Sequence, residues 1–181
     1  MQYSTALSDG VLALACLPTL HRSVVIDGEP YWDGGYAANP AVFPLFQECS
    51  ARDILLVMLA PLHHDQTPQS AVEIKNRVME LGFNATFLRE MRMFAQLRER
   101  AVHSAWWRRG ELDRRLVGTH FHVVEASDVM RALSSESKAA ASMRFFERLF
   151  GQGREHGLAW LSAHRADIGQ RSSADLGALF Y

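Results

Sequence analysis

One continuous apolar segment limits the folds open to this chain more than any other feature. Residues 53–60 read DILLVMLA, with a charged residue at the start, and Pro61 follows at once. An uninterrupted apolar run of this length is typical of a strand buried on both faces, as in a parallel sheet covered by helices. A second short strand, FHVV, is predicted over residues 121–124. Such strands between helical segments indicate an α/β fold.

A long helical pattern follows the apolar strand. Thr67 is its predicted N-cap and Pro68 its first position. Gly82 and Asn84 interrupt the pattern, so it fits either one kinked helix or two shorter ones. Further helices are predicted over about residues 139–150 and 157–166. Spacings of three and four place one set of apolar residues on a single face of the long helix: Ile74, Val78, Leu81, Ala85, Leu88, Met91 and Ala95.

The first fifty residues predict a short helix, a hairpin and a second short helix. Residues 4–15 begin with capping side chains and then become apolar, which predicts a short buried helix. The β-prone runs 23–26 and 29–32 flank an Asp-Gly pair that favours a tight turn. Asn39-Pro40 predicts the start of a helix that continues to about Gln47. No repeat or linker-like stretch divides the sequence, so we expect one domain or part of one.

Composition excludes several classes of function. The 19 lysines and arginines against 20 acidic residues give a net charge of −1, so the basic excess that nucleic-acid binding requires is missing. No apolar run approaches the roughly 20 residues that span a bilayer. Cys16 and Cys49 are too few for a disulfide scaffold, and the residues before Cys16 lack the positive charge of a signal peptide. We therefore expect a cytoplasmic protein in a reducing environment.

Three motifs in order resemble the patatin-like phospholipases. They are Ala15-Cys16-Leu17-Pro18, then Tyr31-Trp32-Asp33-Gly34-Gly35-Tyr36 after the hairpin, then Asn39-Pro40. The likeness is clearest over residues 4–95, and residues 116–181 would add a C-terminal strand and helices. The resemblance implies that residues 1–181 are the C-terminal part of a three-layer α/β/α sandwich that lacks its N-terminal strands.

The resemblance also implies a serine–aspartate dyad that hydrolyses acyl esters of lipids without a cofactor or a metal. Asp33 would take the proton from the attacking serine, while Gly34 and Gly35 would allow positive φ and close backbone approach. A carboxylate is a weak base at neutral pH unless apolar groups desolvate it, and Trp32 and Tyr36 flank this one. The alternative is that Asp33 only begins a turn, as Asp-Gly pairs often do.

The chain departs from the family's pattern at the nucleophile. It contains no Gly-x-Ser-x-Gly elbow and no Gly-rich oxyanion loop before Asp33; Gly151 and Gly153 flank a glutamine and follow no strand. We therefore expect the isolated chain to be inactive. The absent strands would leave the apolar strand with an open edge, to be covered by a partner that carries the missing half, by an upstream reading frame or by self-association. A non-catalytic module that docks through this edge is the alternative.

Two other groups of residues are candidate sites. His63-His64-Asp65 lie in a predicted loop, while His120 and His122 alternate on a strand and so face one side, where they could share a metal; ordinary polar roles are favoured. Trp106-Trp107-Arg108-Arg109 suits peripheral contact with a membrane, where indole rings lie at headgroup depth. The interpretation favoured for this segment places one tryptophan in the core and the other over a partner surface.

Overall fold

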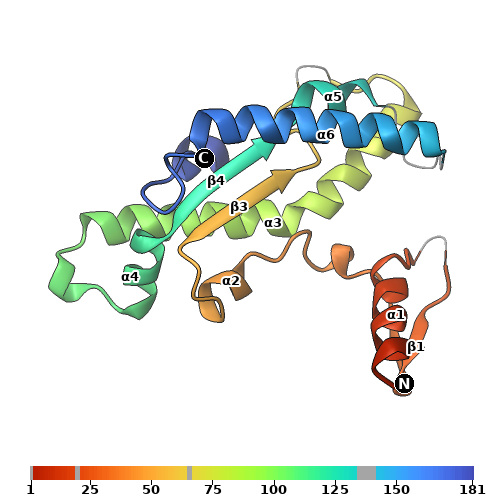
Figure 1. Cartoon of the computed structure of the whole chain (residues 1–181), viewed down its shortest axis with the longest axis horizontal. Helices are drawn as coiled ribbons and strands as arrows, with labels where there is room; N and C mark the ends of the chain where they lie inside the picture. The colour runs from red at the N-terminus through yellow and green to blue at the C-terminus, as the bar shows by residue number, and fades with distance from the viewer. Residues whose placement is uncertain (1, 19–20, 65–66, 134–141) are drawn as a thin grey trace.

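The structure of the chain is a computed structural model that describes residues 2–18, 21–64, 67–133 and 142–181 (Figure 1). It mixes helices with two small sheets. The elements in chain order are α1 (Gln2–Leu14), β1 (Val24–Ile26), β2 (Glu29–Tyr31), the 3-10 turn η1 (Gly34–Tyr36), α2 (Phe43–Gln47), β3 (Asp53–Met58), α3 (Ala71–His103), η2 (Trp106–Arg108), α4 (Glu111–Gly118), β4 (His120–Glu125), α5 (Ser127–Ala132), α6 (Met143–His164) and α7 (Leu176–Phe180).

The two predicted strands of the apolar type pair in parallel, which confirms an α/β arrangement at this coarse level. Ile54 is opposite Phe121 and Leu56 is opposite Val123, so these side chains share one face of the β3–β4 pair. That face packs against α3 in the hydrophobic core. Because strand side chains alternate, His122 points to the opposite face, where its ring lies 5.6 Å from that of Trp160 in α6.

The prediction that β3 is buried on both faces is wrong. Ile54 and Leu56 are buried, but Leu55, Val57 and the following Leu59 are all at least half exposed. The physical reason is that α6 packs against β4, through Trp160 among others, whereas a cavity and not a packed contact lies between α6 and the end of β3. Among the strands in the described ranges, β4 is the only neighbour of β3, so the other edge of β3 has no strand beside it.

α3 is one uninterrupted helix despite Gly82 and Asn84. Its N-cap is Ser70, three residues after the predicted cap, and the Ser70 hydroxyl accepts from the Glu73 N–H at 3.2 Å. The Glu73 carboxylate accepts from the Ser70 N–H at 3.0 Å, which completes a capping box. This reciprocal pair satisfies two N–H groups at the start of the helix that have no partner within it.

Only the second half of α3 belongs to the core. Met91 and Ala95 of the predicted apolar face are buried and Leu88 is partly buried, but Ile74, Val78, Leu81 and Ala85 are exposed. The reason is that the second half lies against β3, β4, α4 and α7, whereas the first half extends past the sheet (Figure 1). Periodicity predicted the face correctly but not how far the sheet covers it.

Aromatic side chains join the remaining elements to this core. The Phe46 ring of α2 lies 4.4 Å from that of Phe94 and 5.6 Å from that of Phe121. From α7, Phe180 contacts Phe87 edge to face at 5.8 Å, and its carbonyl accepts from Arg92 Nε at 3.0 Å. The C-terminus is therefore fixed to the middle of α3.

The N-terminal hairpin is confirmed, and Asp27 and Gly28 both adopt positive φ, as a type I′ turn requires. The helix before it is confirmed, but the prediction that it is buried is wrong. Ala13 is buried, but Val11, Leu12 and Leu14 are exposed, because the main contact of α1 is with β1 and the helix lies apart from the β3–β4 sheet (Figure 1).

Two other helix predictions had the wrong limits. The short helix starts at Phe43, not after Asn39, because the Glu90 carboxylate of α3 accepts from the Val42 and Phe43 N–H groups and caps it there. α6 is one helix instead of two, because its glycines face open space and do not break it. Residues 139–141 of the earlier prediction lie outside the described ranges. None of the helices in those ranges is long and apolar enough to cross a bilayer.

A pair of methionines on α3 tests this account of the core. Met91 is 0% exposed and Met93 is 51% exposed. We expect Met91→Ala to lower the free energy of unfolding by about 2 to 5 kcal/mol, because the substitution leaves a cavity, and Met93→Ala to change it by less than about 0.5 kcal/mol. Urea denaturation followed by circular dichroism measures both; equal losses would contradict the assignment of this helix face to the core.

Candidate functional site

Asp33 occupies a defined turn directly after the hairpin. Its N–H donates to the Cys16 carbonyl at 2.9 Å, which ties it to the end of α1. Its Oδ1 accepts from the Gly35 N–H at 2.8 Å and so caps the 3-10 turn η1. Among the described residues, no hydrogen bond to Oδ2 is found. The carboxylate is therefore oriented through one oxygen, while the other remains available as an acceptor.

The two glycines of the motif behave differently from each other. The expected positive φ is wrong for both, since the only glycines with positive φ in the described ranges are Gly28 and Gly169. Close approach is confirmed at Gly35 alone, where a Cβ atom would lie 3.1 Å from Asp33 Oδ1 and 3.6 Å from the Phe83 ring. A Cβ atom at Gly34 would meet no atom within 4 Å. Gly35 is thus the glycine that the Asp33 turn requires.

The flanking aromatic residues do not enclose Asp33. The Tyr36 ring packs 4.6 Å from that of Phe83 and joins the turn to α3. Trp32 Nε1 donates to the His21 carbonyl at 3.2 Å. Both aromatic side chains are nearly half exposed, and Asp33 itself is partly exposed. The described residues therefore do not give Asp33 the desolvation that a catalytic carboxylate needs.

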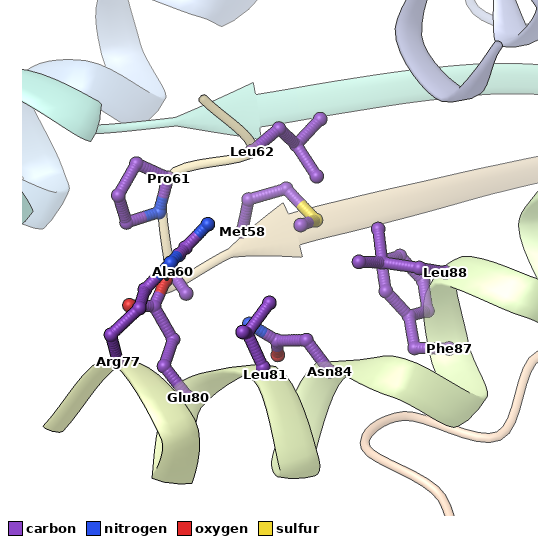
Figure 2. A pocket seen from close by; sticks show the side chains of 10 residues that line it. All are labelled: Met58, Ala60, Pro61, Leu62, Arg77, Glu80, Leu81, Asn84, Phe87 and Leu88. Carbon is purple, nitrogen blue, oxygen red and sulfur yellow. Dashed lines mark ion pairs between the residues drawn. The ribbon is translucent and has the colours of Figure 1, made fainter. Parts of the chain in front are cut away.

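A small cavity lies where the carboxyl end of β3 meets the first half of α3, the sheet edge at which α/β proteins usually bind ligands (Figure 2). Leu81, Asn84 and Phe87 point toward Met58 from the helix. The cavity volume is about 30 Å³, room for on the order of one water molecule. Asp33 does not line it, so this cavity gives the carboxylate no substrate site.

The charged residues beside this cavity are already paired. Glu80 Oε1 lies 2.8 Å from His64 Nε2 and 3.2 Å from Arg77 Nη1. His64 therefore has an ordinary polar role in the loop, while Asp65 of the predicted His63-His64-Asp65 group lies outside the described residues.

A larger cavity of about 210 Å³ lies between the ends of β3 and β4 and the helices α5 and α6. Two of its polar residues have partners, whereas the buried Gln152 Oε1 has no hydrogen bond among the described residues. His156 Nε2 lies 3.3 Å from Asp128 Oδ1, and the Glu125 carboxylate accepts from the Ser127 hydroxyl at 2.9 Å. The remaining walls are mainly aliphatic: Val57, Leu59, Val124, Val129, Met130 and Leu149. This lining offers space for apolar groups but no reactive side chain without a partner.

A polar cluster that sequence reasoning missed forms at the opposite, amino end of the parallel strands. Asp53 Oδ1 lies 3.0 Å from His122 Nε2 and 3.4 Å from His120 Nδ1, and it accepts from the Gly169 N–H at 2.8 Å. On its other side, His122 Nδ1 lies 2.9 Å from Ser173 Oγ. The signal was present in part, because alternation predicted that His120 and His122 share a side, but their partners are distant in sequence.

This Ser–His–Asp chain holds the structure together and shows no further feature of a nucleophilic site. A nucleophile needs N–H donors aimed at the developing oxyanion. The Ser173 and Ala174 N–H groups both donate to the Phe121 carbonyl, and the Gly169 N–H is used by Asp53. His122 is buried and bonded at both ring nitrogens. The cluster therefore fixes residues 169–174 to the start of β4.

Neither histidine pair forms a metal site in the described residues, where no group of three or more His, Cys, Asp or Glu is arranged to hold an ion. His120 and His122 share a carboxylate instead. His64, His120 and His122 therefore have carboxylate partners within the fold, and His63 is exposed.

The prediction that one of Trp106 and Trp107 lies in the core is wrong. Trp106 is 73% exposed and Trp107 is 70% exposed, so neither is a core residue. Their rings contact only each other, edge to face at 5.9 Å, within the aromatic pairs of the described ranges. The cause is the position of η2, which follows the end of α3 and lies beyond the part of that helix that packs in the core.

Lowering the pH tests the contribution of the Asp53 cluster to stability. The Gly169 N–H and then His122 lower the pKa of Asp53, with a smaller contribution from His120 and against the effect of burial. A lowered native pKa stabilises the fold above the ordinary carboxyl range, and this stabilisation is lost as pH falls through the lowered value. We expect Asp53→Asn to destabilise the protein at neutral pH and the two unfolding curves to converge in acid.

Asp128→Asn is the matched control for this measurement. Asp128 also pairs with a histidine, but its side chain is 73% exposed, so solvent screens the pair. Thermal unfolding of the three proteins from neutral to acidic pH makes the comparison. A constant difference between wild type and Asp53→Asn at every pH would show that the charge on Asp53 contributes nothing.

Comparisons with protein-family models, with curated proteins and with solved structures found no match to the chain. The resemblance to the patatin-like phospholipases therefore stays a prediction from the motifs.

Proposed function

We propose that the chain is the aspartate-bearing part of a lipid acyl-ester hydrolase that uses a serine–aspartate dyad. The position of Asp33 carries this proposal. It lies directly after the hairpin, its Oδ1 is fixed by the Gly35 N–H at 2.8 Å, and its Oδ2 has no partner among the described residues. A carboxylate oriented through one oxygen and free at the other suits a general base.

In the proposed reaction the serine belongs to another polypeptide surface. Its hydroxyl oxygen bonds to the acyl carbonyl carbon while Asp33 Oδ2 takes the hydroxyl proton, and the alcohol of the ester leaves with that proton. Water then hydrolyses the acyl-enzyme, again with Asp33 as base. The resulting assembly would be the three-layer patatin-type sandwich, to which this chain contributes the parallel β3–β4 pair.

Two features support the need for a second surface. The sequence has no Gly-x-Ser-x-Gly elbow, and triad enzymes that lose their nucleophile keep only about 10³ to 10⁴-fold catalysis over water, which itself depends on an oxyanion hole. Asp33 also lacks the apolar enclosure that would make it a base at neutral pH.

A reducing cytoplasm remains the expected setting, since Cys16 and Cys49 are both free thiols.

Activity-based labelling tests the proposal. The tagged chain is recovered from its own cells with its associated proteins and treated with a fluorophosphonate, which labels activated serines. We expect an associated polypeptide to be labelled, no label on the 20.4 kDa chain, and turnover of a p-nitrophenyl ester by the complex. Asp33→Asn should lower that turnover by about 10²-fold or more without releasing the partner.

Asp27→Asn is the control for this experiment. Asp27 lies in the preceding hairpin turn with φ 51°, a conformation that asparagine also adopts, so this variant should keep full turnover. Labelling of the 20.4 kDa chain itself, or equal turnover with Asn at position 33, would refute the dyad.

A second candidate function is that of a non-catalytic interaction module. The observation that favours it is the uncovered side of β3, where Leu55 and Val57 are exposed beside an edge with no strand among those described. Unpaired edge N–H and C=O groups together with an apolar face form a template for strand addition. Under this hypothesis Asp33 only caps its turn.

The β3 face gives this candidate its own test. We expect the purified chain to self-associate, and Leu55→Lys with Val57→Lys to convert it to a monomer, because two charges would have to be buried in the contact. Val72→Lys with Val78→Lys, on the exposed first half of α3, is the control that should stay associated. Light scattering after gel filtration gives the masses; a monomeric wild type, or monomers from both variants, would contradict docking through β3.

A further inference from the structure

We propose that the tip between α3 and α4, residues 98–115, docks on an anionic phospholipid surface through Trp106 and Trp107. Figure 1 shows this connection projecting at the end of the molecule away from α1. The proposal does not depend on Asp33 or on any hydrolase activity.

The two indole rings of the tip are exposed to solvent. Both side chains are at least 70% exposed, and Val102 and Leu112 beside them in the sequence are about half exposed. Indole is the largest apolar side chain, and it prefers the boundary between lipid headgroups and acyl chains, where the ring is sheltered and its N–H stays hydrated. Two adjacent rings at a projecting end are placed to enter that boundary together.

Hydrogen bonds hold the tip in one conformation. Arg109 Nε donates to the Ala101 carbonyl at 2.8 Å and its Nη2 to the Val102 carbonyl at 3.0 Å, which caps the end of α3. Arg114 Nη1 donates to the Arg109 carbonyl at 3.1 Å, which joins α4 to the turn. The tryptophans therefore project from a braced turn, and docking would cost little conformational entropy.

The positive charge of the tip is complementary to an anionic lipid surface. Residues 98–115 contain six arginines and three carboxylates, a net charge of +3 in a chain whose net charge is −1. Arg98 faces the core, where its guanidinium lies 5.7 Å from the Phe121 ring and interacts with the Asp175 carboxylate, and Arg115 Nη2 donates to the Leu45 carbonyl of α2. The cations that the tip presents outward are therefore Arg100, Arg108, Arg109 and Arg114, and none of these four forms an ion pair with a carboxylate in the described ranges. Exposed cations beside an anionic membrane add electrostatic attraction to the insertion of the indole rings.

Flotation of the full chain with vesicles tests the proposal. We expect binding to vesicles of phosphatidylcholine mixed with phosphatidylserine, and weaker binding to phosphatidylcholine alone. Trp106→Ala with Trp107→Ala should lower the bound fraction by about tenfold or more, because both interfacial anchors are removed. Neither substitution should shift the thermal unfolding midpoint, since both side chains are exposed.

Phe146→Ala with Phe150→Ala is the matched control, because it removes two exposed aromatic rings from α6 and leaves the tip intact. This variant should float like the wild type. Equal flotation of the tryptophan variant, or failure of the wild type to bind either kind of vesicle, would overturn the proposal. Displacement of the wild type from vesicles by soluble polyglutamate in high salt would also overturn the proposal, because the tip would then bind acidic protein in preference to lipid.

Discussion

The contact between the second half of α3 and one face of the β3–β4 pair is the interaction on which the rest of the structure depends. Phe87, Met91 and Phe94 lie in the core with Ile54 and Phe121. α2, α4 and α7 each reach this contact with one or two buried side chains, Phe46, Leu116 and Phe180 among them. The second half of α3 is therefore the element around which the other core side chains pack.

The same geometry explains why so much apolar surface stays exposed. α6 packs against β4, whereas a cavity lies between α6 and the end of β3, and the first half of α3 extends past the sheet. Leu55 and Val57 on the strand and Val72 and Val78 on the helix consequently face outward. Exposed apolar area of this extent is a feature of interaction sites in proteins that fold normally. Asp33 is likewise not enclosed by the residues beside it.

The sequence predicted local features well and tertiary coverage poorly. The hairpin was predictable because the Asp27-Gly28 turn is a local interaction, and both β3 and β4 were predictable as strands, although their pairing with each other was not predicted. The start of α2 was not predictable, since its cap is Glu90, more than forty residues away. The burial of β3 was overestimated because an apolar strand has the same sequence whether or not a partner covers it.

The candidate site divides in the same way. The Asp33 turn with its Gly35 contact lies within a few residues and was visible in the motif. The Asp53–His122–Ser173 cluster joins residues up to about 120 positions apart, and no pattern in the sequence linked them. The exposure of Trp106 and Trp107 depended on where α3 ends relative to the core, which periodicity alone does not reveal.

The open edge of β3 is the central claim, and amide exchange followed residue by residue by NMR on the monomeric chain tests it most directly. In a parallel pair, alternate N–H groups of β3 bond to β4 and the others point to the free edge. We therefore predict slow and fast exchange in alternation along Asp53–Met58, next to uniformly slow exchange in the second half of α3. Uniformly slow exchange along the whole of β3 in the monomer would show that the chain covers its own edge, and would contradict the account.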